Sequence, residues 1–322
     1  MNKKSRGFLI AVLAVIVLAL SSCSSCGRRV TPPQAGKLTI RFLDVGQGDS
    51  ELIQLPNGHA ILIDSGDRGA PTVGLLRRYG VGAVDLVVAT HPHSDHIGEM
   101  RDVLREFRVA EFWDSGFVNS TRTYTDMLQE IKARGVLLQS PKRGVTRTFG
   151  DVSLEVLNPG PAFIDDSPNN ASLVVLMTYG AKRFLFTGDA ELDAWSEMVT
   201  ADAGKLRADL LKAAHHGSSN GSSADILDAV RPSIVTISCA AGNDYHYPHP
   251  RVVRLLDQRR NAIALYRTDI EGTITAVCDG NTIEMSSEKQ AAGGLYLTGD
   301  QAAGNVPDAG RKGERRSSRR SR

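Results

Sequence analysis

The stretch that decides the fold is Thr90-His91-Pro92-His93-Ser94-Asp95-His96, which directly follows the apolar run Asp85–Ala89. An apolar run of this length predicts a buried strand. Three imidazoles and one carboxylate then fall within six residues. Several desolvated imidazoles side by side cost stability unless they bind a cation, so the sequence predicts a metal site at the end of this strand.

The spacing of these side chains indicates how they share the metal. His91 and His93 are two positions apart, so in an extended segment both point the same way and reach one cation. Asp95 and His96 come after the expected turn and face a second cation beside the first. These four residues are the first candidate ligands, and Asp95 is also a candidate catalytic residue.

The H-x-H-x-D-H string resembles the signature of the metallo-β-lactamase superfamily, whose members have a four-layer αββα sandwich and a hydrolytic site with one or two metal ions. Three later features match that family in the same order: Asp64 after the strand Ala60–Ile63, Asp189 after Arg183–Thr187, and His215-His216 after Leu210–Lys212. The resemblance covers most of the chain and implies an α/β (α+β) fold of this kind.

Four further sequence motifs narrow the resemblance. Leu43–Ser50, Asn169–Leu173, His215–Ser218 and Tyr247-Pro248-His249-Pro250 are similar to the hydrolase-like domain of the ComEC family of competence proteins. We therefore expect a hydrolase domain over residues 37–287.

The resemblance implies a role for each matching residue. His91 and His93 bind the first ion, Asp95 and His96 bind the second, and Asp189 bridges the two. Either His215 or His216 completes the second site, and His215 is favoured because it comes first off the strand. The expected set of residues that orient ligands or contact substrate is Asp44, Gln47, Asp49, Asp64, Asn169, Asn170, His216 and Ser218.

The chain departs from the superfamily at one place. The family usually supplies another histidine between the metal string and the bridging aspartate, but residues 97–188 contain none, and Asn169-Asn170 stands there instead. Asparagine is a weak, neutral ligand, so the first site is expected to be looser and to tolerate manganese as well as zinc. One or two divalent ions, Zn or Mn, are the expected cofactors.

Such ions lower the pKa of bound water to near 7, which gives a hydroxide nucleophile at neutral pH. Asp95 would accept or aim its proton. His249 has two open interpretations: it protonates a leaving group, or it shapes the turn before the helix expected at 251–259.

The chain has 322 residues, and its first segment has the features of an exported protein. Lys3, Lys4 and Arg6 precede an uncharged apolar run from Gly7 to Leu20, which suits a secretory signal better than a membrane span. Leu20-Ser21-Ser22-Cys23 resembles a bacterial lipobox and predicts a signal peptide over residues 1–23 with lipidation at Cys23. An uncleaved membrane anchor is the alternative, and a linker over residues 24–36 follows.

The two ends of the chain are basic and the body is acidic. Residues 37–288 carry 25 basic and 33 acidic side chains, whereas residues 289–322 carry eight basic and three acidic ones. The tail from residue 288 to 322 is therefore expected to be a disordered basic segment. Cys239 and Cys278 could form a disulfide or remain free thiols.

Three functions are compatible with these features. The first is hydrolysis of a phosphodiester, with DNA, RNA or a cell-envelope phosphodiester as substrate and the membrane as a partner through the lipid anchor. The second is a β-lactamase or other acyl hydrolase. The third is a DNA-uptake accessory protein without catalytic activity.

Overall fold

The computed structural model describes residues 36–291, 294–299 and 301. Within these residues the strands form two sheets. The first has eight strands, in the spatial order β15 (Ile283–Ser287), β14 (Ile274–Cys278), β1 (Leu38–Phe42), β2 (Glu51–Gln54), β3 (Ala60–Ile63), β4 (Ala83–Ala89), β5 (Arg108–Asp114) and β6 (Leu137–Gln139). The second has seven, in the order β13 (Ala264–Arg267), β12 (Ile234–Ile237), β11 (Leu210–Lys212), β10 (Lys182–Phe186), β9 (Val174–Tyr179), β8 (Val152–Asn158) and β7 (Thr146–Phe149).

Alternating side chains hold the two sheets together. On β9, Val175 and Met177 pack into the apolar core between the sheets, which also contains Phe42 of β1 and Phe184 of β10. Val174, like Leu176, belongs to a second core on the opposite face of the same sheet. Both faces of β9 are therefore covered, which explains its nearly continuous apolar sequence.

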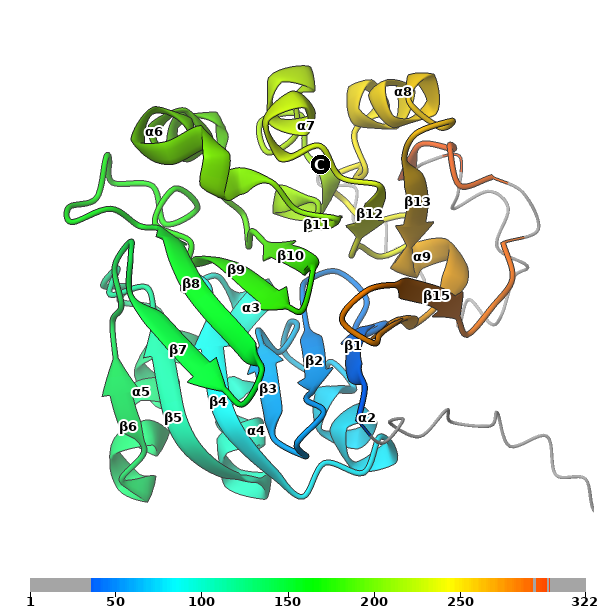
Figure 1. Cartoon of the computed structure of the whole chain (residues 1–322). Coiled ribbons are helices and arrows are strands. Elements are labelled where there is room, and N and C mark those ends of the chain that lie inside the picture. The colour runs from blue at the N-terminus through cyan, green and yellow to red at the C-terminus, as the bar shows by residue number, and fades with distance from the viewer. Residues whose placement is uncertain (1–35, 292–293, 300, 302–322) are drawn as a thin grey trace, which may run out of the picture. The chain divides into compact units, whose positions relative to one another are not determined.

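Helices α6 (Leu192–Asp202), α7 (Ala224–Val230) and α8 (Pro250–Gln258) lie on the outer face of the second sheet (Figure 1). Trp195 of α6, Ile226 of α7 and Val252 of α8 belong to the second core together with Leu185 of β10. Helices α2, α4 and α5 lie along the first sheet (Figure 1). The predicted four-layer αββα sandwich is confirmed. The helices are α2 (Thr72–Arg78), α3 (Ser94–Ile97), α4 (Met100–Glu106), α5 (Arg122–Arg134), α6 (Leu192–Asp202), α7 (Ala224–Val230), α8 (Pro250–Gln258) and α9 (Thr268–Glu271), with 3₁₀ turns η1 (Ala203–Leu206) and η2 (Ala214–Gly217).

Parallel strand pairs direct the predicted site residues to one edge. Strand β3 pairs with β4, and β10 pairs with β11, in parallel. The carboxyl ends of parallel strands meet at the same edge of a sheet, where ligands bind in open α/β sheets. Asp64, Thr90, Asp189 and Ala213 follow β3, β4, β10 and β11, respectively.

The C-terminal part of the body completes the first sheet and continues past the expected end of the domain. Strand β14 pairs antiparallel with β1, so the last strands return to the first sheet. The expected disordered tail from residue 288 begins too early, because Leu295 and Tyr296 pack against the second core. The Arg267 guanidinium also donates to the carbonyl oxygen of Leu295 over 3.0 Å.

Other predictions concern the cysteines and the termini. Cys239 and Cys278 are both buried free thiols. The predicted signal peptide with Cys23, and the basic residues from Arg311 on, lie outside the described residues. Among the residues that are described, no helix combines the length and the hydropathy needed to cross a membrane.

Candidate metal centre

Asp64 and Thr90 tie the ends of two neighbouring strands together beneath the metal string. The Thr90 backbone N–H donates to Oδ1 of Asp64 over 2.8 Å, and the Thr90 hydroxyl donates to Oδ2 over 2.7 Å. Both side chains are buried. The Asp64 carboxylate therefore fixes the point at which the chain leaves β4 and begins the histidine string.

The string continues into the short helix α3, which carries Asp95 and His96, and then breaks before α4. Gly48 permits the neighbouring loop to approach this helix. Its φ is +127°, and a Cβ at this position would lie 2.1 Å from the carbonyl oxygen of Asp95. The backbone N–H of Asp49 donates to the same carbonyl over 3.1 Å, so the loop that carries Gln47 and Asp49 is held against the site.

Three groups of side chains among the described residues have the composition of metal sites, and two of them share Asp189; the third is Asp49, Asp64 and His96. His91, His93 and Asp189 form the first group, whose ligand atoms lie within 4.8 Å of one another. Nε2 of His91 lies 3.0 Å from Nδ1 of His93 and 3.8 Å from Oδ2 of Asp189. Two imidazole nitrogens and a carboxylate oxygen that converge in this way suit a divalent ion.

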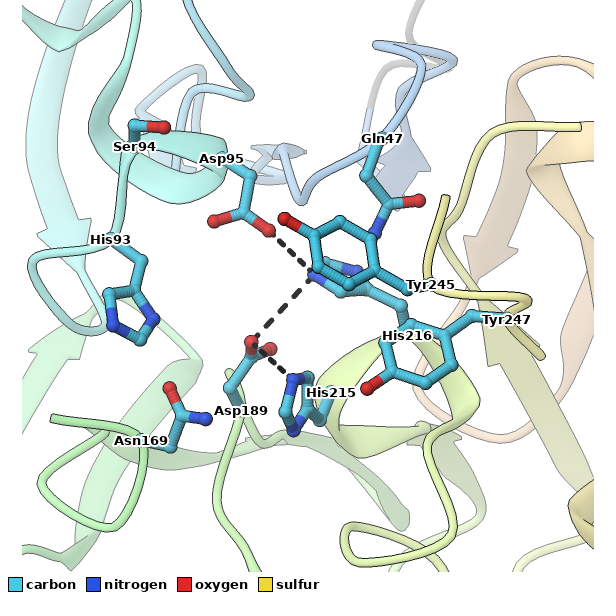
Figure 2. Close-up of a pocket in the computed structure, with 10 residues that line it drawn as sticks. All are labelled: Gln47, His93, Ser94, Asp95, Asn169, Asp189, His215, His216, Tyr245 and Tyr247. Atoms are coloured by element: carbon cyan, nitrogen blue, oxygen red, sulfur yellow. Dashed lines mark hydrogen bonds and ion pairs between the residues drawn. The ribbon is translucent and has the colours of Figure 1, made fainter. Parts of the chain in front are cut away.

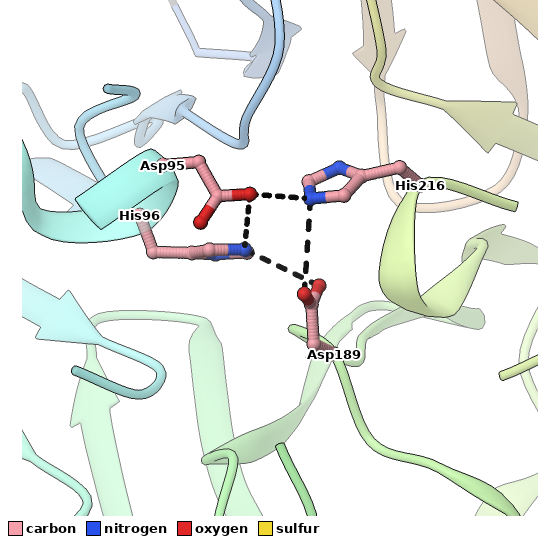
Figure 3. A group of neighbouring side chains, drawn as sticks. All are labelled: Asp95, His96, Asp189 and His216. Atoms are coloured by element: carbon pink, nitrogen blue, oxygen red, sulfur yellow. Dashed lines mark hydrogen bonds and ion pairs between the residues drawn. The ribbon is translucent and has the colours of Figure 1, made fainter. Parts of the chain in front are cut away.

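The second group is Asp95, His96, Asp189 and His216, in which the four side chains point toward one another (Figure 3). Nε2 of His96 lies 3.3 Å from Oδ1 of Asp189, and Nε2 of His216 lies 3.1 Å from Oδ2 of Asp95. The contact of Nε2 of His96 with Oδ1 of Asp189 is an ion pair without hydrogen-bond geometry, so in the described structure neither of these buried atoms has a hydrogen-bond partner. Buried polar atoms without partners are costly, and a bound cation would satisfy both, so the donor set fits a second divalent ion.

Asp189 belongs to both groups and can therefore bridge two ions. Its position is fixed by its own backbone, because the Asp189 N–H donates to the hydroxyl of Ser172 over 3.1 Å. The Asn158 amide in turn donates to the carbonyl oxygen of Ser172 over 2.8 Å.

Further carboxylates orient the imidazoles from behind. Nδ1 of His96 lies 2.7 Å from Oδ2 of Asp64, so Nε2 of His96 faces the second group. Nδ1 of His216 lies 3.0 Å from the carbonyl oxygen of Ser238 and 3.2 Å from Oδ1 of Asp49. Asp49 also contacts the buried Lys212 ammonium. A carboxylate on the far nitrogen of an imidazole fixes its tautomer and ring orientation, which is the role that we expected for Asp49 and Asp64.

The structure brings His216, rather than the favoured His215, into the second group. Both residues adopt left-handed backbone angles, with φ of 50° and 53°, so the chain turns sharply after β11 instead of extending from it. The turn directs His216 inward, where it is buried, and leaves His215 in the pocket wall. Nδ1 of His215 lies 3.3 Å from Oε1 of Glu191, and its Nε2 lies 3.8 Å from Oδ2 of Asp189.

The two asparagines occupy different places. The Asn169 side chain lines the pocket beside His93, and its Nδ2 donates to Glu191 over 2.8 Å. Its Oδ1 is buried without a hydrogen-bond partner among the described residues, so this oxygen remains available to an ion or a substrate. Asn170 bonds through its amide to Asp165 over 2.7 Å and accepts from the Glu191 N–H, so it braces the loop behind the pocket.

Burial and charge set the protonation of the site. Burial lowers the pKa of His91 well below its usual value, and the neighbouring His96 lowers this pKa further. Burial also lowers the pKa of His216, but the carboxylates of Asp189 and Asp49 outweigh burial and raise this pKa to about 10. Burial alone would raise the pKa of Asp189, yet His96 and His216 hold it well below the ordinary range. In the metal-free site the second group therefore carries protons that a cation has to displace.

An open pocket of about 280 Å³ lies next to both groups. Figure 2 shows its lining side chains, which come from the loops after β1, β4 and β8, from α3, and from the loops that follow β10, β11 and β12. They are Gln47, His93, Ser94, Asp95, Asn169, Asp189, His215, His216, Tyr245 and Tyr247. Ser94 and Tyr247 stand within the quoted sequence motifs but were not assigned to the site. Tyr245 was not predicted at all, because no spacing ties the two tyrosines to the histidine string.

Three expected site residues lie elsewhere. His249 is the N-cap of α8 and accepts from the Arg251 N–H over 3.2 Å, so its structural interpretation is favoured over proton donation. Asp44 lies 3.9 Å from the Lys289 ammonium and does not line the pocket. The Ser218 hydroxyl bonds to Asn220 in the turn after His216 and supports that turn.

Comparison with known proteins agrees with this geometry. Residues 43–241 match the domain described as Metallo-beta-lactamase superfamily. The chain is 31% identical over 258 residues to ComE operon protein 3 of Bacillus subtilis, which covers 73% of this chain and 32% of that protein. It is 30% identical over 237 residues to Recombination protein 2 of Haemophilus influenzae, which covers 70% of this chain and 27% of that protein. The chain thus spans less than a third of the length of both relatives.

Among solved structures, a mutant of CmlA β-hydroxylase shares the fold with a TM-score of 0.51 at 15% identity, over 76% of this chain and 54% of that one. The family match covers the strand ends, the histidine string, Asp189 and His216, which are the parts of the chain that build the two side-chain groups. On this evidence the chain belongs to the metallo-β-lactamase superfamily, and its sequence relatives include the ComEC-like competence proteins.

Proposed function

We propose that this superfamily member is a metal-dependent phosphodiesterase, with nucleic acid or a cell-envelope phosphodiester as its substrate. The observation that supports this most strongly is the position of Asp189. It is shared by a three-residue and a four-residue group of metal-ligand type, and it lines the open pocket of about 280 Å³. A phosphate that enters this pocket would meet both groups at once.

Each of the two side-chain groups would bind one ion, and Asp95 would also handle a proton. His91, His93 and Asp189 would hold one ion, and Asp95, His96, Asp189 and His216 the other. Zinc or manganese ions bound there would supply a hydroxide nucleophile at neutral pH and neutralise charge on the phosphoryl oxygens. Asp95 is 24% exposed at its side chain and lines the pocket, so it can accept or direct a proton of the attacking water.

Asn169 favours a phosphodiester over an acyl substrate. An amide oxygen donates less electron density to a cation than the neutral imidazole that the superfamily usually supplies, so the first ion would be the stronger Lewis acid and more open to an added ligand. A phosphodiester carries the negative charge that such an ion attracts. Among the candidate substrates, the name of the relative Recombination protein 2 favours DNA.

The cellular location is part of the same proposal. The basic and apolar residues before Cys23 would export the chain, and a lipid on Cys23 would attach it to a membrane. The hydrolase body would then act outside the cytoplasm on nucleic acid or an envelope polymer.

Turnover of bis(p-nitrophenyl) phosphate by the purified protein, with manganese or zinc added to a metal-free preparation, tests the activity. We expect release of p-nitrophenol with added metal and none in excess chelator. Asp189→Asn should abolish turnover while leaving the circular dichroism spectrum unchanged. His59→Ala is a matched control, because His59 is a half-exposed imidazole that pairs with Asp85 away from the pocket.

Two other outcomes would replace the proposal. Hydrolysis of nitrocefin without hydrolysis of any phosphodiester would identify an acyl hydrolase. No turnover of either substrate with any divalent metal would favour the non-catalytic accessory role.

A further inference from the structure

Two tyrosines form the wall of the pocket opposite Asn169 (Figure 2). The ring of Tyr245 is nearly parallel to that of Tyr247, with 5.7 Å between their centroids and 16° between their planes. The Tyr247 ring meets His215 edge to face at 5.5 Å and 72°. The stacked pair therefore lies directly beside the metal groups.

The loop that carries these rings is braced from within. The buried Asn243 side chain donates to the carbonyl oxygens of Ala240 and Tyr247 over 2.8 and 2.7 Å, and accepts from the Tyr247 N–H over 3.0 Å. Tyr247 is half-buried, whereas Tyr245 is 62% exposed. The inner ring is thus fixed by the fold, and it supports an outer ring whose free face is open to solvent.

We propose that Tyr245, supported by Tyr247, is a stacking platform for a nucleobase attached to the phosphate that enters the pocket. This inference rests on the proposed phosphodiesterase function and selects nucleic acid, in single-stranded form, among its substrates. A single exposed tyrosine would be unremarkable on a protein surface. Here the exposed ring is one layer of a stack that borders a candidate catalytic pocket, and exposed aromatic faces beside a phosphate site bind unpaired bases without regard to their sequence.

The angle between the rings favours a base over a quaternary ammonium group. A choline-type cation is held by several aromatic faces that enclose it. Tyr245 and Tyr247 are inclined by only 16° and contact each other, so together they offer one flat face rather than an enclosure. A planar base fits that face by offset stacking, as aromatic rings do with one another.

The first test compares two esters that share a leaving group, thymidine 5′-(p-nitrophenyl) phosphate and methyl p-nitrophenyl phosphate. Tyr245→Ala should lower kcat/KM for the thymidine ester by about 5- to 150-fold, the range for loss of one base–aromatic stack. The value for the methyl ester should not change. Tyr245→Phe keeps the ring and is the matched control, so it should retain the preference for thymidine.

A binding measurement that needs no turnover accompanies the first test. A fluorescein-labelled, phosphorothioate-linked thymidine pentanucleotide should bind the manganese-loaded wild type more tightly than its abasic counterpart, by anisotropy. Tyr245→Ala should remove that difference and Tyr245→Phe should keep it.

The outcomes separate this inference from the proposed function. Turnover of the methyl ester, with identical thymidine preference in the wild type and Tyr245→Ala, would overturn the platform and leave the phosphodiesterase standing. Tyr245-dependent binding of the pentanucleotide without turnover of any ester would support the platform and overturn the phosphodiesterase. If Tyr245→Ala impaired only hydrolysis of p-nitrophenylphosphorylcholine, the wall would be a choline site and the inference wrong.

Discussion

Nδ1 of His96 lies 2.7 Å from Oδ2 of Asp64, and both side chains are fully buried. The contact turns Nε2 of His96 toward Asp189 and the pocket. Because carboxylates behind metal-ligating imidazoles typically change metal affinity 10- to 100-fold, we expect Asp64→Asn to weaken binding to the second group by about that factor. Isothermal titration calorimetry, with zinc added to the metal-free protein, measures this affinity.

Asp85→Asn is the matched control for this substitution. Asp85 also pairs with an imidazole, that of His59 at 2.8 Å, but it lies outside the pocket. Unchanged affinity in Asp64→Asn, together with an intact fold, would remove Asp64 from the metal centre.

His215 and His216 should behave differently although they are adjacent. His216→Ala removes a nitrogen that lies 3.1 Å from Asp95, so the protein should lose the ion of the second group. His215→Ala should keep that ion, because His215 faces Glu191. Metal content after dialysis, measured by mass spectrometry, distinguishes the two. Loss of metal in His215→Ala alone would show that His215, as the sequence favoured, is the ligand of the second ion.

Metal binding should release protons. The pKa of His216 is raised to about 10 by Asp189 and Asp49 against the effect of burial, and Asp189 and Asp64 raise the pKa of His96 well above its usual value. At pH 7.5 we therefore expect His216 to be protonated in the metal-free protein, so it has to lose a proton before Nε2 can bind a cation, and the pKa of His96 is shifted in the same direction.

The number of protons released follows from titrating zinc into the protein in buffers of different ionisation enthalpy. We expect up to two per ion bound at the second group, and fewer as the pH rises toward 10. Zero release at pH 7.5 would show that the imidazoles are already neutral.

Lys212 should be important for stability. Its ammonium is 1% exposed and contacts the equally buried Asp49 carboxylate. Lys212→Met would remove the ammonium that faces this buried carboxylate and leave His216 as a remaining cationic neighbour. Loss of one partner of a buried ion pair costs up to about 3–5 kcal/mol in the free energy of unfolding. Urea denaturation of the metal-free protein measures the cost.

Lys205→Met is the matched control for Lys212→Met. Lys205 pairs with Glu155 at the surface, where its side chain is 49% exposed, and exposed pairs contribute about 0–1 kcal/mol. Equal effects of the two substitutions would mean that water reaches Lys212.

The elements near the metal string were predictable because the signal is local. The apolar runs before Asp64, His91 and Asp189 each determine their own conformation, and the structure has strands β3, β4 and β10 there. The break between α3 and α4 depends instead on a distant segment. A Cβ at Gly98 would lie 2.3 Å from the Arg68 backbone nitrogen, and that close approach involves a segment some 30 residues away in sequence.

The sequence by itself determined the superfamily, the two-sheet sandwich and most of the candidate ligands, because a metal requires specific donor atoms at short spacings after strand ends. Only the tertiary structure decided between His215 and His216, moved His249 to a helix cap and brought Tyr245 to the pocket. These outcomes depend on backbone turns and on contacts between segments more than 100 residues apart, such as that of His216 with Asp95. No local spacing encodes the direction in which such a side chain points.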